Sequence, residues 1–241
     1  RTPATSLPEA LAVILSQDLP MSQALAAYAA ELRRLNPTFA SAYDELVARL
    51  QSIDVGAAAP KVGEAMPDFV LPDQDGRLIR LDDFTRKGPV VISINRGHWC
   101  PFCRIELSGL ETQYAQLAGQ GAHFVSIMPE RREFTKIAQQ RGVTFPILSD
   151  IDHGYALTLG LVFWIGAELE GLMMKAGRSL PAYQGANGWF LPVPATFVVG
   201  ADGRILARHV DPDFRLSRME GEEIAAALNA DWSMITATQV Y

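Results

Sequence analysis

The sequence predicts an α/β fold in which helices pack on a mixed central sheet, preceded by a helical extension. From about residue 62 onward, short apolar runs typical of buried strands alternate with segments of helical periodicity. The alternation ends in a hairpin followed by a helix, which gives the sheet both parallel and antiparallel neighbours. The 241-residue chain is long enough for one large domain with an appendage, or for two small domains.

Residues 1–60 are expected to form the helical extension. Three segments, Pro8–Ser16, Pro20–Leu35 and Pro37–Ile53, each begin with proline, which is tolerated in the first turn of a helix. In the second segment, apolar residues such as Leu25 and Leu32 recur at helical spacing. We expect this extension to pack against the rest of the chain or to form a homodimer interface, rather than to take a direct part in chemistry.

Residues 61–241 are expected to form the α/β domain, with an insertion around residues 151–190. The predicted strands are Phe69–Leu71, Leu78–Leu81, Val90–Asn95, Ala122–Met128, Phe145–Leu148, Ala195–Val199 and Arg204–Val210. The predicted helices are Arg104–Leu117, Arg132–Gln140 and Glu220–Asn229. Asp75-Gly76 and Asp202-Gly203 are typical of hairpin turns.

Composition argues against several classes of function. The formal net charge is −6 and no block of Lys or Arg stands out, so nucleic-acid binding is not expected. The apolar run Leu157–Ala167 is much shorter than the roughly 20 residues of a membrane span. The first residues lack the basic and apolar pattern of a secretory signal, so we expect a cytoplasmic location.

The two cysteines, Cys100 and Cys103, are the clearest chemical signal. They lie between a predicted strand and a predicted helix, and a thiol at a helix N-terminus is favoured as the thiolate. The second thiol, one turn away, can resolve a mixed disulfide or a sulfenic acid. Two alternatives are an inert buried pair and half of a zinc site. Zinc needs two further ligands, and the histidines show no ligand-like pairing, so we expect neither a metal nor a cofactor.

Neighbouring residues add to this prediction. Arg96 supplies positive charge close to the thiols, and Pro101 suits the first turn of the helix. Trp99 is expected to pack beside the motif. His98 could tune the thiols, bind substrate or lie in a solvated loop. Further along the chain, Pro194 directly precedes a predicted strand, and we expect a cis Val193–Pro194 bond that exposes a backbone edge to substrate beside the cysteines.

Several segments together resemble the thioredoxin superfamily, and in particular its alkyl hydroperoxide reductase/thiol-specific antioxidant branch with the peroxiredoxin-like proteins. WCPFC (residues 99–103) is similar to the thioredoxin and glutaredoxin active site. VGEAMPDFVL (62–71), TFPILSD (144–150) and ATFVV (195–199) are similar to peroxiredoxin segments. The resemblance covers about residues 62–230 and implies a thioredoxin-like three-layer sandwich with a mixed central sheet.

The sequence departs from the peroxiredoxin pattern, in which Pro-x-x-x-Thr-x-x-Cys is followed three residues later by Glu. Aligning Cys103 and Glu106 with the pattern's Cys and Glu places Cys100 at the Thr and Arg96 at the Pro. Pro194 stands where the family has its second catalytic Arg. Helix position thus favours Cys100 as the first nucleophile, as we expect for a protein disulfide, whereas the alignment favours Cys103 for a peroxide.

The resemblance implies an oxidoreductase. The leading hypothesis is a thiol peroxidase that reduces hydroperoxides through the Cys-x-x-Cys centre and is regenerated by an external dithiol, such as a thioredoxin- or glutaredoxin-type reductant. The second hypothesis is a thioredoxin-like protein disulfide oxidoreductase. The third hypothesis is a non-enzymatic redox sensor or scaffold, and it is suggested by the helical extension.

Overall fold

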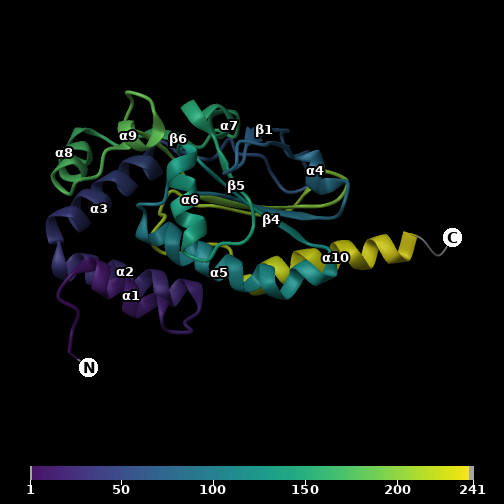
Figure 1. Cartoon of the computed structure of the whole chain (residues 1–241), viewed down its shortest axis with the longest axis horizontal. Coiled ribbons are helices and arrows are strands. Elements are labelled where there is room, and N and C mark those ends of the chain that lie inside the picture. Colours follow the sequence, from purple (N-terminus) through teal and green to yellow (C-terminus); the bar gives the residue numbers. More distant parts are fainter. Residues whose placement is uncertain (1, 239–241) are drawn as a thin grey trace.

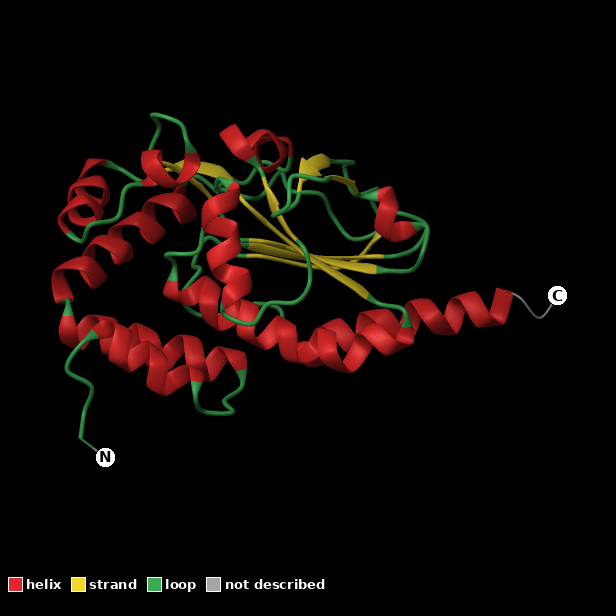
Figure 2. Ribbon diagram, viewed as in Figure 1, coloured by secondary structure: helices red, strands yellow, loops and turns green. Residues whose placement is uncertain are grey.

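The computed structural model describes residues 2–238 (Figures 1 and 2). The helices are α1 (Leu7–Leu15), α2 (Met21–Leu35), α3 (Pro37–Ser52), α4 (Asp82–Thr85), α5 (Pro101–Leu117), η1 (Ala118–Gln120), α6 (Arg132–Gln140), η2 (Ile151–His153), α7 (Gly154–Thr158), α8 (Ala167–Lys175), α9 (Leu180–Gln184) and α10 (Gly221–Thr238). The strands are β1 (Val70–Pro72), β2 (Leu78–Arg80), β3 (Val90–Ile94), β4 (His123–Met128), β5 (Ile147–Ser149), β6 (Val162–Trp164), β7 (Phe190–Pro192), β8 (Ala195–Val199) and β9 (Ile205–Val210).

The central sheet is mixed, as predicted, with strand order β5-β4-β3-β8-β9. β3, β4 and β5 are parallel, whereas β8 is antiparallel to both β3 and β9. The register pairs Ile92 with Val125 on one side and with Phe197 on the other. β3 therefore lies in the middle of the sheet, and the chain that leaves its carboxyl end leads directly into the cysteine motif.

Two apolar layers cover the two faces of this sheet. Successive side chains of a strand point to opposite faces, so Val91 packs with α5 and α10, and Ile92 packs with the other layer. Figure 1 shows α5 and α10 side by side along one face. The predicted hairpins also form, since β1 pairs with β2 and β8 pairs with β9.

The extension forms α1, α2 and α3, close to their predicted bounds. Ser6 caps α1 and Asn36 caps α3 through their side chains, and proline occupies the first turn of both helices. Buried residues of these helices, such as Leu25 and Leu50, belong to the same continuous hydrophobic cluster as Ile92 of the sheet. The extension therefore packs against the rest of the chain and shares its core.

The segment around residues 151–190 adds α7, β6, α8 and α9, and it ends in β7, which pairs with β6 as a separate two-stranded sheet. Figure 1 shows α8 and α9 gathered with α3 at one end of the molecule, opposite the far end of α10. Arg49 of α3 donates a hydrogen bond of 2.7 Å to the Trp164 carbonyl, which ties the extension to this segment. No helix within residues 2–238 is long and apolar enough to cross a membrane.

Two helix boundaries differ from the prediction by three residues or more. The helix expected from Arg104 begins at Pro101, because Cys100 itself caps it. The helix expected to end at Asn229 continues to Thr238, and Trp232 on this added stretch still packs partly against the sheet-side cluster. Tertiary contacts thus extend this helix beyond the end that the sequence pattern predicts.

Candidate active site around Cys100 and Cys103

Cys100 is the residue that caps α5. Its backbone is extended (φ −81°, ψ 114°), and its sulfur accepts a hydrogen bond of 3.3 Å from the backbone N–H of Cys103. Its carbonyl accepts the Arg104 N–H at 3.0 Å, the first bond of the helix. Pro101 follows at the first helical position, where no N–H is needed. A sulfur in this position faces unpaired N–H groups and the positive end of the helix, which favour a negative charge on it.

Arg96 connects the two cysteines. Its Nη2 lies 3.3 Å from the Cys100 sulfur, and its backbone N–H donates to the Cys103 sulfur at 3.4 Å. The side chain is only 1% exposed and is enclosed by aromatic rings, with the Phe214 ring centre 3.8 Å and the Trp99 ring centre 5.0 Å from the guanidinium carbon. Contact with ring faces suits a cation that has been removed from water. Arg96 thus places a fixed positive charge beside the Cys100 sulfur.

The two thiols differ in acidity. Burial opposes ionisation of Cys100, yet its pKa lies well below its usual range, because the Cys103 thiol donates a hydrogen bond to it and because Arg96 and Arg218 are positively charged. Burial, that same hydrogen bond and the negative charge on Cys100 raise the pKa of Cys103 well above its usual range. The arrangement therefore favours the thiolate form of Cys100 over that of Cys103.

Glu106 lies behind the cysteines in a buried network. Its Oε1 accepts hydrogen bonds from Ser93 at 3.1 Å and from Thr196 at 3.0 Å, and its Oε2 pairs with Arg218. Both partners of this ion pair are almost fully buried. Arg218 also donates to the Phe214 carbonyl, which fixes the loop that carries the ring over Arg96. Glu106 therefore secures the second positive charge near the thiols.

A second polar pair lies at the rim of the motif. His98 Nδ1 lies 2.6 Å from a carboxylate oxygen of Glu130, and the backbone N–H of His98 donates to the other oxygen at 2.7 Å. Burial raises the pKa of Glu130, although the bonds from His98 act in the opposite direction. Gly97 allows this approach, since its φ is +149° and a Cβ there would lie 1.9 Å from Glu130 Oε1. The interpretation of His98 as a solvated loop residue is wrong, because its side chain is mostly buried against Glu130.

Pro194 corrects one expectation. The chain contains no cis peptide bond among residues 2–238, so the Val193–Pro194 bond is trans. The trans form is the intrinsically favoured one, and it lets the chain run extended from β7 into β8, while Val193 N–H donates to the Leu161 carbonyl at 2.7 Å. No cis bond therefore exposes a backbone edge to substrate at Pro194, contrary to the prediction. Pro194 is buried and precedes Ala195, which pairs with Ile94 at the end of β3.

The structure brings together the other residues singled out in the sequence. Trp99 packs beside the motif as expected, and Cys100, Cys103, Arg96, Pro101 and Glu106 lie along one strand-to-helix connection and the first turns of α5. Sequence reasoning missed Tyr43, Glu130 and Arg218. Glu130 follows β4, the parallel neighbour of β3, and the carboxyl ends of parallel strands are a usual place for a site. No local pattern marks Tyr43 or Arg218.

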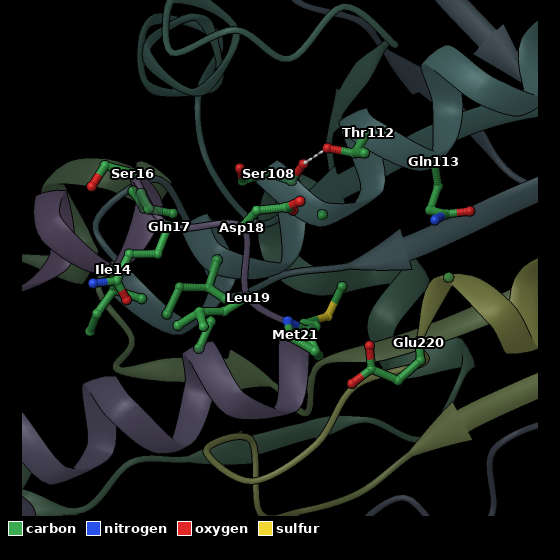
Figure 3. Close-up of a pocket in the computed structure, with 16 residues that line it drawn as sticks. Ile14, Ser16, Gln17, Asp18, Leu19, Met21, Ser108, Thr112, Gln113 and Glu220 are labelled. Atoms are coloured by element: carbon green, nitrogen blue, oxygen red, sulfur yellow. Dashed lines mark hydrogen bonds between the residues drawn. The ribbon is translucent and has the colours of Figure 1, made fainter.

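The two sulfurs lie below the protein surface. Cys100 and Cys103 are both 0% exposed. A cavity of about 390 Å³ lies between the α1–α2 connection, α5 and the start of α10, where Asp18, Ser108 and Glu220 face it (Figure 3). Neither cysteine lines this cavity. A second cavity, of about 400 Å³, reaches Gly97 and His98 at the rim of the motif. Neither cysteine lines this second cavity either.

Comparison with known proteins identifies the relatives of this chain. A family model described as AhpC/TSA family matches residues 62–208. Peroxiredoxin Bcp of Escherichia coli (strain K12) is 28% identical over 158 residues, which are 65% of this chain and 88% of that protein. Thiol-disulfide oxidoreductase ResA of Geobacillus thermodenitrificans (strain NG80-2) is 36% identical over 95 residues, 38% of this chain and 53% of that protein.

Solved structures show the same fold. Peroxidoxin BcpB from Mycobacterium tuberculosis is 25% identical, with a TM-score of 0.53 over 70% of this chain and 97% of that one. The peroxiredoxin 6 of Arenicola marina, 16% identical, has a TM-score of 0.56 over 74% of this chain and 76% of that one. The predicted thioredoxin-like fold is therefore confirmed. With a family model that spans more than half of its length, the chain belongs to the AhpC/TSA family.

Proposed function

We propose that this chain is a thiol peroxidase in which Cys100 is the attacking thiolate and Cys103 the resolving thiol. The observation that carries the proposal is the asymmetric placement of the pair: Arg96 Nη2 and the Cys103 backbone N–H both lie 3.3 Å from the Cys100 sulfur, and this surrounding lowers the pKa of Cys100 while the pKa of Cys103 is raised. This assignment differs from the alignment, which favours Cys103 for peroxide. A thiol whose proton is retained by burial and by a neighbouring thiolate is a poor nucleophile.

In the proposed cycle, the Cys100 thiolate attacks the terminal oxygen of a hydroperoxide and the O–O bond breaks. The transferred oxygen keeps its hydrogen, and the released alkoxide takes a proton from solvent and leaves as an alcohol or water. The resulting Cys100 sulfenic acid condenses with the Cys103 thiol, which forms a disulfide and releases water. An external dithiol then reduces the disulfide by exchange and is itself oxidised. Arg96 stabilises the initial thiolate and remains in place through the cycle.

The test follows the reduced protein in a stopped-flow experiment with hydrogen peroxide and with an organic hydroperoxide. We expect Cys103→Ser to accumulate a sulfenic acid on Cys100, detected by a sulfenic-acid trap and mass spectrometry, and Cys100→Ser to react no faster than a free thiol. Rapid sulfenic acid formation on Cys103 in the Cys100→Ser protein would reverse the assignment. If neither variant exceeds a free thiol, the peroxidase proposal fails.

A protein disulfide oxidoreductase is the second candidate. The Cys-x-x-Cys spacing at a helix N-terminus and the similarity to ResA over 95 residues favour it. The complete burial of Cys100 weighs more heavily against it than against a peroxidase, because a protein disulfide needs a larger opening to reach the sulfur than a hydroperoxide does. Insulin reduction by the reduced chain, compared with peroxide consumption under the same conditions, separates the two. Stoichiometric oxidation without turnover on either substrate would instead support a redox sensor.

A further inference from the structure

One nitrogen of Arg96 serves two partners. Its Nη2 lies 3.3 Å from the Cys100 sulfur and 3.2 Å from the hydroxyl oxygen of Tyr43, which accepts a hydrogen bond from it. Tyr43 belongs to α3, in the extension, and stands 53 residues before Arg96. A residue outside the segment matched by the family model therefore contacts the positive charge beside the thiolate.

The guanidinium group of Arg96 has few other polar contacts. Among residues 2–238, no carboxylate forms an ion pair with Arg96, and its Nε has no hydrogen-bond partner. Its remaining close neighbours are aromatic faces, which attract a cation without fixing the direction of its N–H bonds. Tyr43 thus supplies a directional polar contact that keeps Nη2 beside the sulfur.

Tyr43 itself is held rigidly. Its ring makes edge contacts with Phe39 (4.9 Å between ring centres), Phe214 (5.0 Å) and Phe102 (6.5 Å), and it is buried. Phe102 lies between the two cysteines in sequence, so the same ring cluster joins α3 to the redox motif. A hydroxyl on a ring fixed in this way has its position set by packing, not by the arginine that it contacts.

We propose that Tyr43 is a positioning residue for the redox centre, which it serves by orienting Arg96 toward Cys100. The extension is then a component of the active site and more than a packing element. The proposal deepens the proposed function, since it rests on Cys100 being the attacking thiolate. It predicts that removing one oxygen from α3 weakens the thiolate on α5.

The experiment titrates the thiolate by its ultraviolet absorbance as a function of pH, which needs no access to the buried sulfur. The Cys100→Ser protein gives the baseline for each variant. For Tyr43→Phe we expect the pKa of Cys100 to rise by about 0.5–1 unit, a roughly three- to tenfold loss of thiolate at pH values below the original pKa. Tyr28→Phe is the matched control. Tyr28 is also buried and packs edge-on against Phe102 at 5.1 Å, but no hydrogen bond joins its hydroxyl to Arg96.

A double-mutant cycle shows whether Tyr43 acts through Arg96. In an Arg96→Lys background, where the planar fork is gone, Tyr43→Phe is expected to shift the pKa of Cys100 by much less than in the wild type. An unchanged or lower pKa in Tyr43→Phe would overturn the proposal, as would an equal shift in both backgrounds or an equal shift in Tyr28→Phe. Far-ultraviolet circular dichroism of each variant checks that the fold is retained.

The titration is independent of the substrate. If the chain proves inactive toward hydroperoxides but Tyr43→Phe still raises the pKa of Cys100, the peroxidase proposal fails and the positioning role stands. If the wild type consumes peroxide rapidly and the pKa does not respond to Tyr43→Phe, the positioning role fails alone. Should Tyr43→Phe not fold, Tyr43→Leu, which is smaller and apolar, gives a second variant without the hydroxyl.

Discussion

Cys100 carries a charge whose pH dependence can be predicted. Because its pKa is lowered, the thiolate is already formed where an ordinary thiol, with a pKa of about 8.5, is still protonated. We expect the rate constant for oxidation by peroxide to rise with pH only through this lowered pKa and to be level from there to pH 8 and above. A rate that keeps rising to about pH 8.5, as for a free thiol, would contradict the thiolate assignment.

The same ionisation affects stability. The unfolded chain keeps the thiol proton up to about pH 8.5, whereas the folded chain releases it at the lowered pKa, so the contribution of Cys100 grows with pH between these two values and is lost as pH falls through the folded pKa. The measurement is the difference in urea unfolding free energy between the wild type and Cys100→Ser, taken below pH 8.5, where Cys103 stays protonated in both states. A pH-independent difference would argue against the shift.

Gly97 permits the close approach of Glu130 to the loop that carries the cysteines. For Gly97→Ala, the new Cβ would meet a carboxylate oxygen at 1.9 Å on a backbone with φ of +149°, so we expect a loss of about 2 kcal/mol or more of unfolding free energy. Gly119→Ala is the control, since no atom lies within 4 Å of its added Cβ, and it should change stability by less than about 1 kcal/mol. Similar losses in both variants would show that the contact is unimportant.

At the scale of elements, Glu106 joins α5 to β3 through Ser93, to β8 through Thr196, and to the loop before α10 through Arg218. For Glu106→Gln we expect a loss of about 3 kcal/mol or more, because a buried guanidinium is left without its counter-charge. Glu31→Gln, which removes the half-buried partner of the exposed Arg34, is the control and should leave the urea midpoint almost unchanged. A Glu106→Gln protein as stable as the wild type would mean that the buried ion pair contributes no net stability.

Elements with a strong local pattern could be predicted from the sequence, and contacts between distant elements could not. The helix Arg132–Gln140 has its predicted bounds, because its apolar and polar residues segregate by helical period. The start of α5 was placed three residues late, since a cysteine is not a usual helix cap. The cis bond at Pro194 was wrong, because local sequence does not decide the isomer. Tyr43 and Arg218 escaped notice because only tertiary packing brings them to the cysteines.

At the scale of the whole molecule, the extension and the sheet share one apolar cluster, so we expect them to unfold together. All the tryptophans, Trp99, Trp164, Trp189 and Trp232, lie outside the extension, whereas circular dichroism also reports α1–α3. The urea transitions followed by the two signals should coincide. A circular dichroism transition that tryptophan fluorescence misses would show that the extension unfolds on its own.

The shared cluster also predicts the effect of a mutation in the extension. Leu50 of α3 is fully buried, and Leu50→Ala should lower the unfolding free energy by about 2–5 kcal/mol. Because the unit is cooperative, fluorescence and circular dichroism should report the same loss. The control is Gln51→Ala on the exposed side of the same helix, which should change stability little. A loss seen by circular dichroism alone would confine the effect to the extension.

The cap that Cys100 places on α5 has a consequence for the reduction potential of the pair. The charge that Arg96 and the helix N-terminus stabilise exists only while the cysteines are reduced, and forming the disulfide consumes it. Stabilising the reduced form makes the couple more oxidising, by about 30 mV for each 1.4 kcal/mol. The disulfide should therefore accept electrons readily, even from a weakly reducing dithiol. Equilibration with a glutathione redox buffer measures this, and Arg96→Lys should move the potential to a more negative value.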